Sequence, residues 1–162
     1  MILQYFKKKE NEYKIKSDII YLNILNKSKL LLNKKYFNEI NFSISFEIIS
    51  VLLIFYLHFL KDKSIGSKKR INEELVKNLV NDLDKSLRDA GISDMSIGKY
   101  VKKYVKKFYY RLMILDEILK KNEDINFASY IQKFGISNYG NSMKITEDLK
   151  ILYNNIVIDK KK

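Results

Sequence analysis

The side chains whose spacing could serve acid–base chemistry are three aspartates close together in the chain, Asp82, Asp84 and Asp89. Paired carboxylates catalyse reactions only where a cleft and a nucleophile or a metal accompany them, and the neighbouring sequence supplies neither. Asp84 and Arg88 are spaced i, i+4, which on a helix predicts a surface ion pair worth about 0.2–0.5 kcal/mol. We therefore interpret these carboxylates as structural and predict that the protein is not an enzyme.

The composition also restricts metal and thiol chemistry. The 162-residue chain has no cysteine, which excludes a disulfide framework, a thiolate zinc site, an iron–sulfur cluster and a cysteine nucleophile. Its single histidine, His58, excludes any mechanism or metal site that needs two imidazoles. We interpret His58 as a satisfied residue near a helix end and Asp94 as a turn or capping residue. The prediction is therefore no cofactor, no metal and no small-molecule substrate.

The charge balance is strongly basic, with 31 Lys and Arg against 19 Asp and Glu and a formal net charge of +12. Arg occurs only at Arg70, Arg88 and Arg111. The excess of Lys over Arg indicates drift under an A+T-rich genome, so the total charge is poor evidence for any partner. The length and the 46% hydrophobic fraction predict one domain with a sizeable core.

The distribution of charge is more informative than the total. Residues 96–121 hold eight basic and two acidic side chains, which is half of the net charge. Such a stripe suits RNA phosphates or anionic lipid headgroups, and a merely solvated helix face has the same composition. At this point all three interpretations stay open.

The most apolar stretch is Phe46–Leu60. It is shorter than the roughly 20 apolar residues of a membrane span, and Glu47, Ser50 and His58 interrupt it. We interpret it as a helix buried in a bundle core, with a membrane anchor as the alternative.

Apolar spacing predicts further helices from Ser17 and over 71–90, 96–121, 124–134 and 142–156. Ser17, Asp124 and Ser142 are candidate N-caps, and Gly91 and Gly135 are candidate stops in the left-handed conformation. The predicted fold is all-α, a single compact bundle of about five to six helices with one long central helix. We expect a flexible basic N-terminus over 1–16, the domain over 17–157 and a basic tail over 158–162.

Two segments, LVNDLDKSLRDAGISDMSIGKYVKK (79–103) and KFYYRLMILDEIL (107–119), resemble the signature of the ubiquinol–cytochrome c chaperone family. In that family a first element, D-x-D-x-x-L-R-x-x-G-[hydrophobic]-x-D-[hydrophobic]-x-[hydrophobic]-G-K, leads into F-Y-x-R and then D-x-x-L. The third aspartate of the first element is Asp94 in this chain. Phe46 and Glu47 also resemble the F-[DE] pair that begins the family's apolar helix. The family's proline before this helix has no counterpart here. Val51 and Leu52 stand where the family often has a Leu-His step, and His58 lies out of register with it. The resemblance therefore assigns no role of the family histidine to this chain.

The resemblance implies an all-α, non-enzymatic assembly factor that binds newly made cytochrome b and promotes assembly of respiratory complex III. It also implies association with the ribosome, an anionic membrane surface and a small partner protein. The implied location is cytoplasmic and peripheral on the inner membrane of a bacterium, or the matrix side in a mitochondrion. The alternative is a basic helical RNA- or ribosome-binding protein without a respiratory client.

The resemblance and the charge stripe together select the residues that we expect to bind the client or a partner. They are Arg88, Gly91, Asp94, Gly98, Lys99, Lys102, Lys103, Lys106, Phe108, Tyr109, Arg111 and Asp116.

We expect Gly91 to permit a tight turn and Arg88 or Arg111 to form a bidentate pair with Asp94 or Asp116, a geometry that Lys cannot reproduce. Such a network either holds the helices in register or forms the client surface. We favour structural support for Asp82 and Asp84, surface recognition for Lys102, Lys103 and Lys106, and an apolar groove between helices for a client helix.

Overall fold

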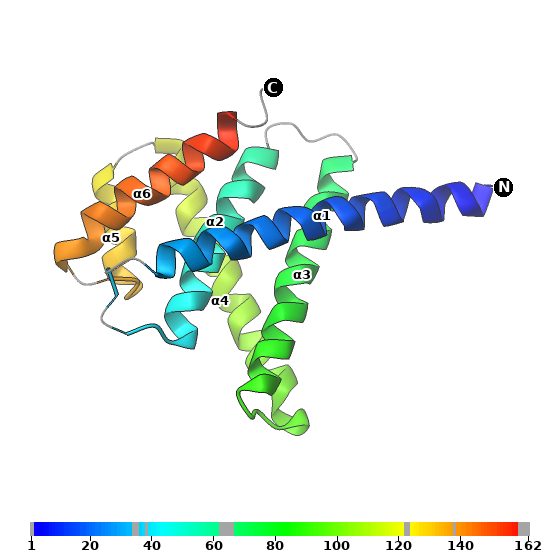
Figure 1. The fold of residues 1–162 in the computed structure, drawn as a ribbon, viewed down its shortest axis with the longest axis horizontal. Helices are drawn as coiled ribbons and strands as arrows, with labels where there is room; N and C mark the ends of the chain where they lie inside the picture. The colour runs from blue at the N-terminus through cyan, green and yellow to red at the C-terminus, as the bar shows by residue number, and fades with distance from the viewer. Residues whose placement is uncertain are drawn as a thin grey trace. The chain divides into compact units, whose positions relative to one another are not determined.

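The structure is a computed structural model that describes residues 2–33, 36, 37, 39–61, 67–121, 124–137 and 139–158. These residues form six helices and no strand: α1 (Ile2–Leu32), α2 (Phe42–Lys61), α3 (Ser67–Asp89), α4 (Asp94–Lys121), α5 (Asp124–Lys133) and α6 (Tyr139–Ile158) (Figure 1). The all-α prediction is confirmed. The long helix predicted from 96 is α4, and α1 is longer still at 31 residues.

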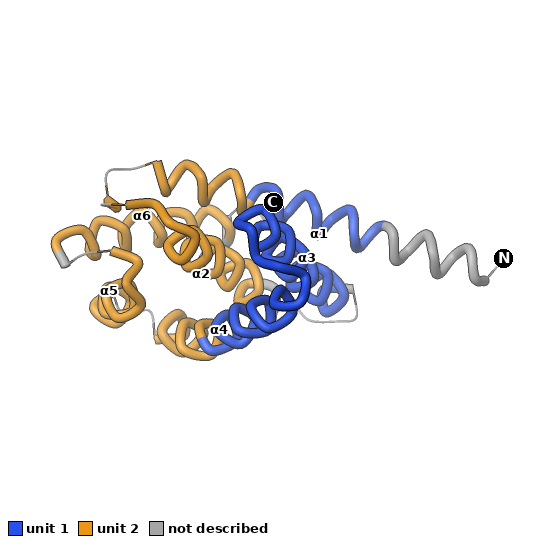
Figure 2. The backbone as a smooth tube through the Cα atoms, turned by 90° about the horizontal axis from the view of Figure 1, so that it is seen from below, with its two compact units in different colours: residues 1–23, 60–110 blue, residues 24–59, 111–162 orange. Residues whose placement is uncertain are grey.

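The helices form two compact units, residues 1–23 with 60–110 and residues 24–59 with 111–162 (Figure 2). Helices α1 and α4 each contribute to both units.

In the first unit, α3 packs through one apolar stripe. Its leucines at 75, 79, 83 and 87 are buried at i, i+4, i+8 and i+12, the apolar spacing that predicted a helix over 71–90. Polar contacts join α3 to α1, because the Tyr21 hydroxyl donates to Asp82 Oδ2 at 3.0 Å and Asn78 Nδ2 donates to Asp18 Oδ1 at 2.9 Å. Asp82 therefore supports the packing of two helices.

Gly91 ends α3 in the left-handed conformation, with φ of 85°. Its amide donates to the Arg88 carbonyl at 2.9 Å, and the Ile92 amide donates to the Leu87 carbonyl at 3.1 Å. This pair of bonds is the Schellman arrangement, which satisfies carbonyls at the helix end. Gly135 ends α5 in the same way, with φ of 65°. Both predicted glycine stops are confirmed.

In the second unit, α2 is the core helix. Every side chain from Val51 to Leu57 is buried. Among the described residues α2 is also the one helix long and apolar enough to cross a membrane, over Phe42–Phe59, and 61% of that window is buried. This burial favours the core-helix interpretation over the membrane anchor.

Two predicted N-caps are wrong, because both serines lie inside helices. Ser17 is buried in α1, which begins at Ile2, and its hydroxyl donates to the Lys14 carbonyl at 2.8 Å. Ser142 is buried in α6, where its hydroxyl accepts a bond from Gln132 Nε2 at 2.9 Å. The Asp124 side chain lies outside the described residues. The predicted boundaries at 16 and 157, and the flexibility of the N-terminus, stay predictions.

Candidate functional site

The predicted site residues fall into both units. Residues 88–108 and Tyr109 belong to the first unit, whereas Arg111 and Asp116 belong to the second. They therefore form separate groups, and the first group lies at the turn between α3 and α4.

At this turn Arg88 holds two carboxylates. Its Nε donates to Asp84 Oδ2 at 2.7 Å and its Nη2 to Asp84 Oδ1 at 3.3 Å, while Nη1 contacts Asp94 Oδ1. The hydrogen bonds to Asp84 and then to Asp94 raise the pKa of Arg88 above its ordinary value. The predicted Asp84–Arg88 pair is confirmed, and Arg88 also contacts Asp94 as expected. The bidentate contact goes to Asp84 instead of Asp94, which receives a single contact from Nη1. Because all three side chains are exposed, the network fastens a solvent-facing turn.

The first half of α4 presents four lysines to solvent. Lys99, Lys102, Lys103 and Lys106 follow one helix face at i, i+3, i+4 and i+7, and all four are exposed. None of them forms an ion pair with a carboxylate of the described residues. We call these four residues the lysine face.

Other exposed positions lie beside the lysine face. Met95 is 99% exposed in the first turn of α4, and Gly98 is exposed with no atom within 4 Å of the position that a Cβ would take. Tyr109 is half exposed, whereas its neighbour Phe108 is fully buried. Phe108 therefore packs in the interior, and Tyr109 is the aromatic residue of this pair that a partner can reach.

In the second unit, Arg111 and Glu47 form a buried bidentate pair. Arg111 Nε donates to Glu47 Oε2 and Nη2 donates to Glu47 Oε1, both at 2.9 Å. The two side chains are 8% and 1% exposed. The guanidinium also lies over the Phe134 ring, with Cζ 3.5 Å from the ring centroid. One arginine thus connects α4 to α2 and to the turn after α5, with geometry that the lysine ammonium does not have.

The charge of Glu47 also acts on Tyr130, which lies on α5. Burial raises the pKa of the Tyr130 hydroxyl strongly, and the neighbouring carboxylate raises it further. Its ring stacks against Phe127 and meets Phe134 edge to face. Tyr130 therefore stays a neutral phenol in the wall around the ion pair.

The predicted bidentate partner of Arg111 was wrong. Asp116 Oδ1 instead forms a hydrogen bond with His58 Nδ1 at 2.7 Å, and Asp116 Oδ2 pairs with Lys120 Nζ at 2.9 Å. His58 is thus a satisfied residue near the end of α2, as predicted. The missed signal was Glu47, because a carboxylate in the most apolar stretch of a chain requires a cation partner once the stretch is buried.

The structure also bears on metal binding. Within the part of the chain that the structure describes, no group of three or more His, Asp or Glu side chains could hold a metal ion.

Comparison with protein families decides the affiliation of the chain. Residues 38–148 match the family described as ubiquinol-cytochrome C chaperone, which is more than half of the sequence. The chain belongs to the ubiquinol–cytochrome c chaperone family. The family resemblance predicted from the two signature segments is therefore confirmed.

A solved structure shares the fold of this chaperone-family protein. The crystal structure of the Cbp3 homolog from Brucella abortus aligns with a TM-score of 0.78 and 20% sequence identity, over 96% of this chain and 88% of that chain. At this identity the likeness establishes the fold. No protein of curated function matches the sequence significantly.

The structure divides the residues of the family signature into a buried group and an exposed group. Glu47, from the F-[DE] pair, and Arg111, from the F-Y-x-R element, meet in one buried ion pair although 64 positions separate them. Arg88, Asp84 and Asp94, from the first element, close an exposed turn. The signature thus contains one group that stabilises an interior and one that shapes a surface.

Proposed function

We propose that this protein is a non-enzymatic chaperone for the assembly of ubiquinol–cytochrome c reductase, respiratory complex III, and that its client is newly made cytochrome b. The observation that carries the proposal is the family match over residues 38–148. The shared fold with the Cbp3 homolog supports it. The cytochrome b client extends the proposal beyond the family description, and the experiment below addresses it.

The lysine face is the surface that supports a peripheral location. A client that is made on ribosomes and enters a membrane lies between two anionic surfaces, RNA phosphate and lipid headgroups. Four exposed lysines on one helix face attract either surface, and salt weakens this attraction. We propose that the protein acts at the cytoplasmic face of the inner membrane, or at the matrix face in a mitochondrion. A small partner protein that acts with it is part of the same proposal.

The competing function is an RNA- or ribosome-binding protein without a respiratory client, which the same lysine face favours. The two functions differ in what accompanies the protein when it is isolated. A chaperone retains cytochrome b after ribosomes are removed by salt, whereas an RNA-binding protein retains nothing of the respiratory chain.

The experiment is affinity isolation of the tagged protein from translating cells at low and at high salt. We expect cytochrome b in both fractions and ribosomes at low salt only. Charge reversal of Lys102, Lys103 and Lys106 to Glu is expected to remove the ribosomes. The matched control reverses three exposed lysines outside the lysine face, at positions 14, 29 and 144. Ribosomes without cytochrome b at either salt concentration would favour the competing function.

A further inference from the structure

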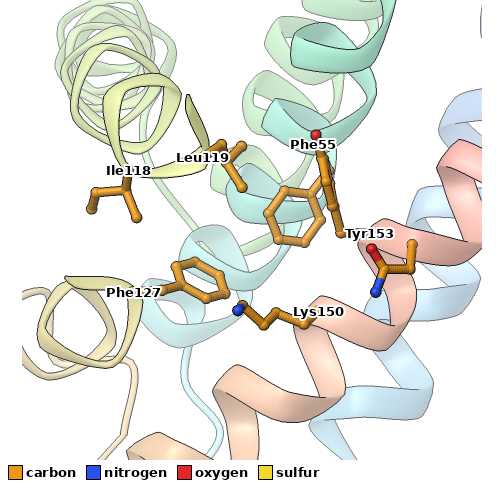
Figure 3. Close-up of a pocket in the computed structure, with 7 residues that line it drawn as sticks. Phe55, Ile118, Leu119, Phe127, Lys150 and Tyr153 are labelled. Carbon is orange, nitrogen blue, oxygen red and sulfur yellow. The ribbon is translucent and has the colours of Figure 1, made fainter. Parts of the chain in front are cut away.

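The second unit contains a cavity of about 200 Å³. Four helices line it, and Figure 3 shows their side chains around the hollow. The lining residues are Phe55 of α2, Ile118 and Leu119 of α4, Phe127 of α5, and Lys150, Tyr153 and Asn154 of α6.

Three of the lining residues are aromatic, and their rings contact one another. The centroid of Phe55 lies 6.0 Å from that of Phe127 and 5.1 Å from that of Tyr153, the latter pair edge to face. Phe55 and Phe127 are buried, so core packing holds both rings in place. Asn154, in contrast, is exposed, which places it at the solvent side of the cavity. The cavity is therefore preformed and open to a ligand from solvent.

The volume limits what the cavity can hold. An apolar protein cavity of about 150 Å³ is large enough to bind benzene. Sites for whole small-molecule ligands occupy roughly 300–1,000 Å³. A cavity of about 200 Å³ therefore admits one six-membered ring with a short stem, and it is too small for a complete porphyrin.

The charge of the lining limits the ligand further. Lys150 is the charged residue among the seven of the lining, and its side chain extends from α6 toward Phe127 (Figure 3). A positive charge at an aromatic wall disfavours a cationic guest, although aromatic walls alone would attract one. The lining therefore selects a ring that is neutral or carries a carboxylate near its stem.

We propose that this cavity receives one aromatic side chain of the client polypeptide, with an acidic group of the client near Lys150. An aromatic side chain that fills a preformed pocket is the usual energetic anchor of a protein interface. The proposal rests on the proposed chaperone function and specifies the site where the client is held.

The first test measures binding of a probe to the purified full-length chain by NMR titration. The probe 3-phenylpropionate carries one ring and one carboxylate, and we expect its Kd to be on the order of millimolar. The neutral 3-phenylpropanamide should bind about tenfold more weakly, and the cationic 3-phenylpropylamine more weakly still. Absence of binding by 3-phenylpropionate, or tighter binding by the amine, would overturn the proposal.

Variants at the rim locate the binding. Asn154→Trp places a large side chain at the open side of the cavity without removing a core contact, and we expect it to weaken probe binding at least tenfold. The matched control is Asn155→Trp, because Asn155 is exposed on the same helix and does not line the cavity. Equal loss in both variants, or none in Asn154→Trp, places the probe elsewhere and contradicts the proposal.

The role of Lys150 has its own comparison. Lys150→Met should abolish the preference for the carboxylate over the amide, whereas Lys144→Met, at an exposed position of α6 outside the cavity, should retain it. A carboxylate preference that persists in Lys150→Met would show that another group recognises the anion.

The last test separates this proposal from the proposed function. Wild type, Asn154→Trp and Asn155→Trp are compared for their ability to restore complex III in a strain that lacks the protein. We expect Asn154→Trp alone to fail, at a normal level of folded protein. If both variants restore complex III, the chaperone function stands and the cavity is not its client site. If wild type itself restores nothing because the strain has no defect, the proposed function fails instead.

Discussion

The two signature arginines of this protein use the same guanidinium chemistry in opposite environments. Arg88 joins Asp84 and Asp94 at an exposed turn, where water screens the charges. Arg111 joins Glu47 in an interior, where the pair is almost completely removed from water and an aromatic ring covers the guanidinium.

The two environments separate the signature residues that stabilise the fold from those that fix the turn between α3 and α4. An exposed ion pair contributes little free energy of folding, so the value of Arg88 lies in fixing the turn that leads into the lysine face. A buried ion pair is costly to form and more costly to break, because removing one partner leaves the other charge without compensation. We therefore expect mutations of the two groups to differ in kind.

The largest expected effect is that of Glu47→Ala, which removes the carboxylate that forms the bidentate pair with the buried Arg111 guanidinium. We expect a loss of about 3–5 kcal/mol in the free energy of unfolding, measured by urea denaturation. The matched change at the exposed network, Asp84→Ala, should leave the urea midpoint nearly unchanged. Similar losses in the two variants would contradict the contrast between the groups.

Arg111→Lys should have the next largest effect on the free energy of unfolding. Lysine keeps the positive charge but loses the second hydrogen bond to Glu47 and the stacking on Phe134, so we expect a loss of about 2 kcal/mol. Arg88→Lys should show no measurable change in the same urea denaturation experiment. If Lys replaces Arg at position 111 without loss, the bidentate geometry is not what that position requires.

Replacing the two signature glycines by alanine should change the free energy of unfolding in opposite directions. Gly91→Ala forces an alanine into φ of +85° and should cost about 1–2 kcal/mol. Gly98→Ala places a methyl group into open space inside α4 and should stabilise by about 0.4–1 kcal/mol. A stabilised Gly98→Ala variant that loses client binding would show that the bare backbone at Gly98 belongs to the binding surface.

An effect that appears only at high pH concerns Tyr21, whose pKa is raised by burial and then by Asp82 above its ordinary value of 10.0. The pKa of Tyr21 is higher in the folded chain than in the unfolded chain. The contribution of the neutral Tyr21 hydroxyl to the free energy of unfolding is therefore complete below about pH 10 and is lost as the pH rises further. Between pH 9 and 11 we expect wild type to lose stability more steeply than Tyr21→Phe, by about 1.4 kcal/mol per pH unit at most. Tyr130 is present in both chains, so the difference isolates Tyr21. Parallel profiles would contradict this account.

Local pattern was enough for part of this structure. The leucine stripe of α3 and the glycine stops at 91 and 135 follow from spacing and backbone conformation alone. The serine caps failed because a buried serine can satisfy its hydroxyl within the helix, as Ser17 does with the Lys14 carbonyl, and then no longer marks a helix start.

Longer-range features were not accessible from spacing. The partner of Arg111 lies 64 positions away, and an i, i+4 rule considers only its own helix. The aromatic cavity depends on side chains of four helices, so no single segment of the sequence contains it. The lysine face was predicted, because the exposed side of an amphipathic helix is set by its own sequence.

We propose above all that this protein assists the assembly of complex III. Its most direct test is the amount of assembled complex III and of spectroscopically detected cytochrome b in a strain that lacks the protein, with the other respiratory complexes as internal controls. We predict that both fall strongly while the other complexes keep their normal level, and that the wild-type chain restores them. Normal complex III in the deletion strain would contradict the account.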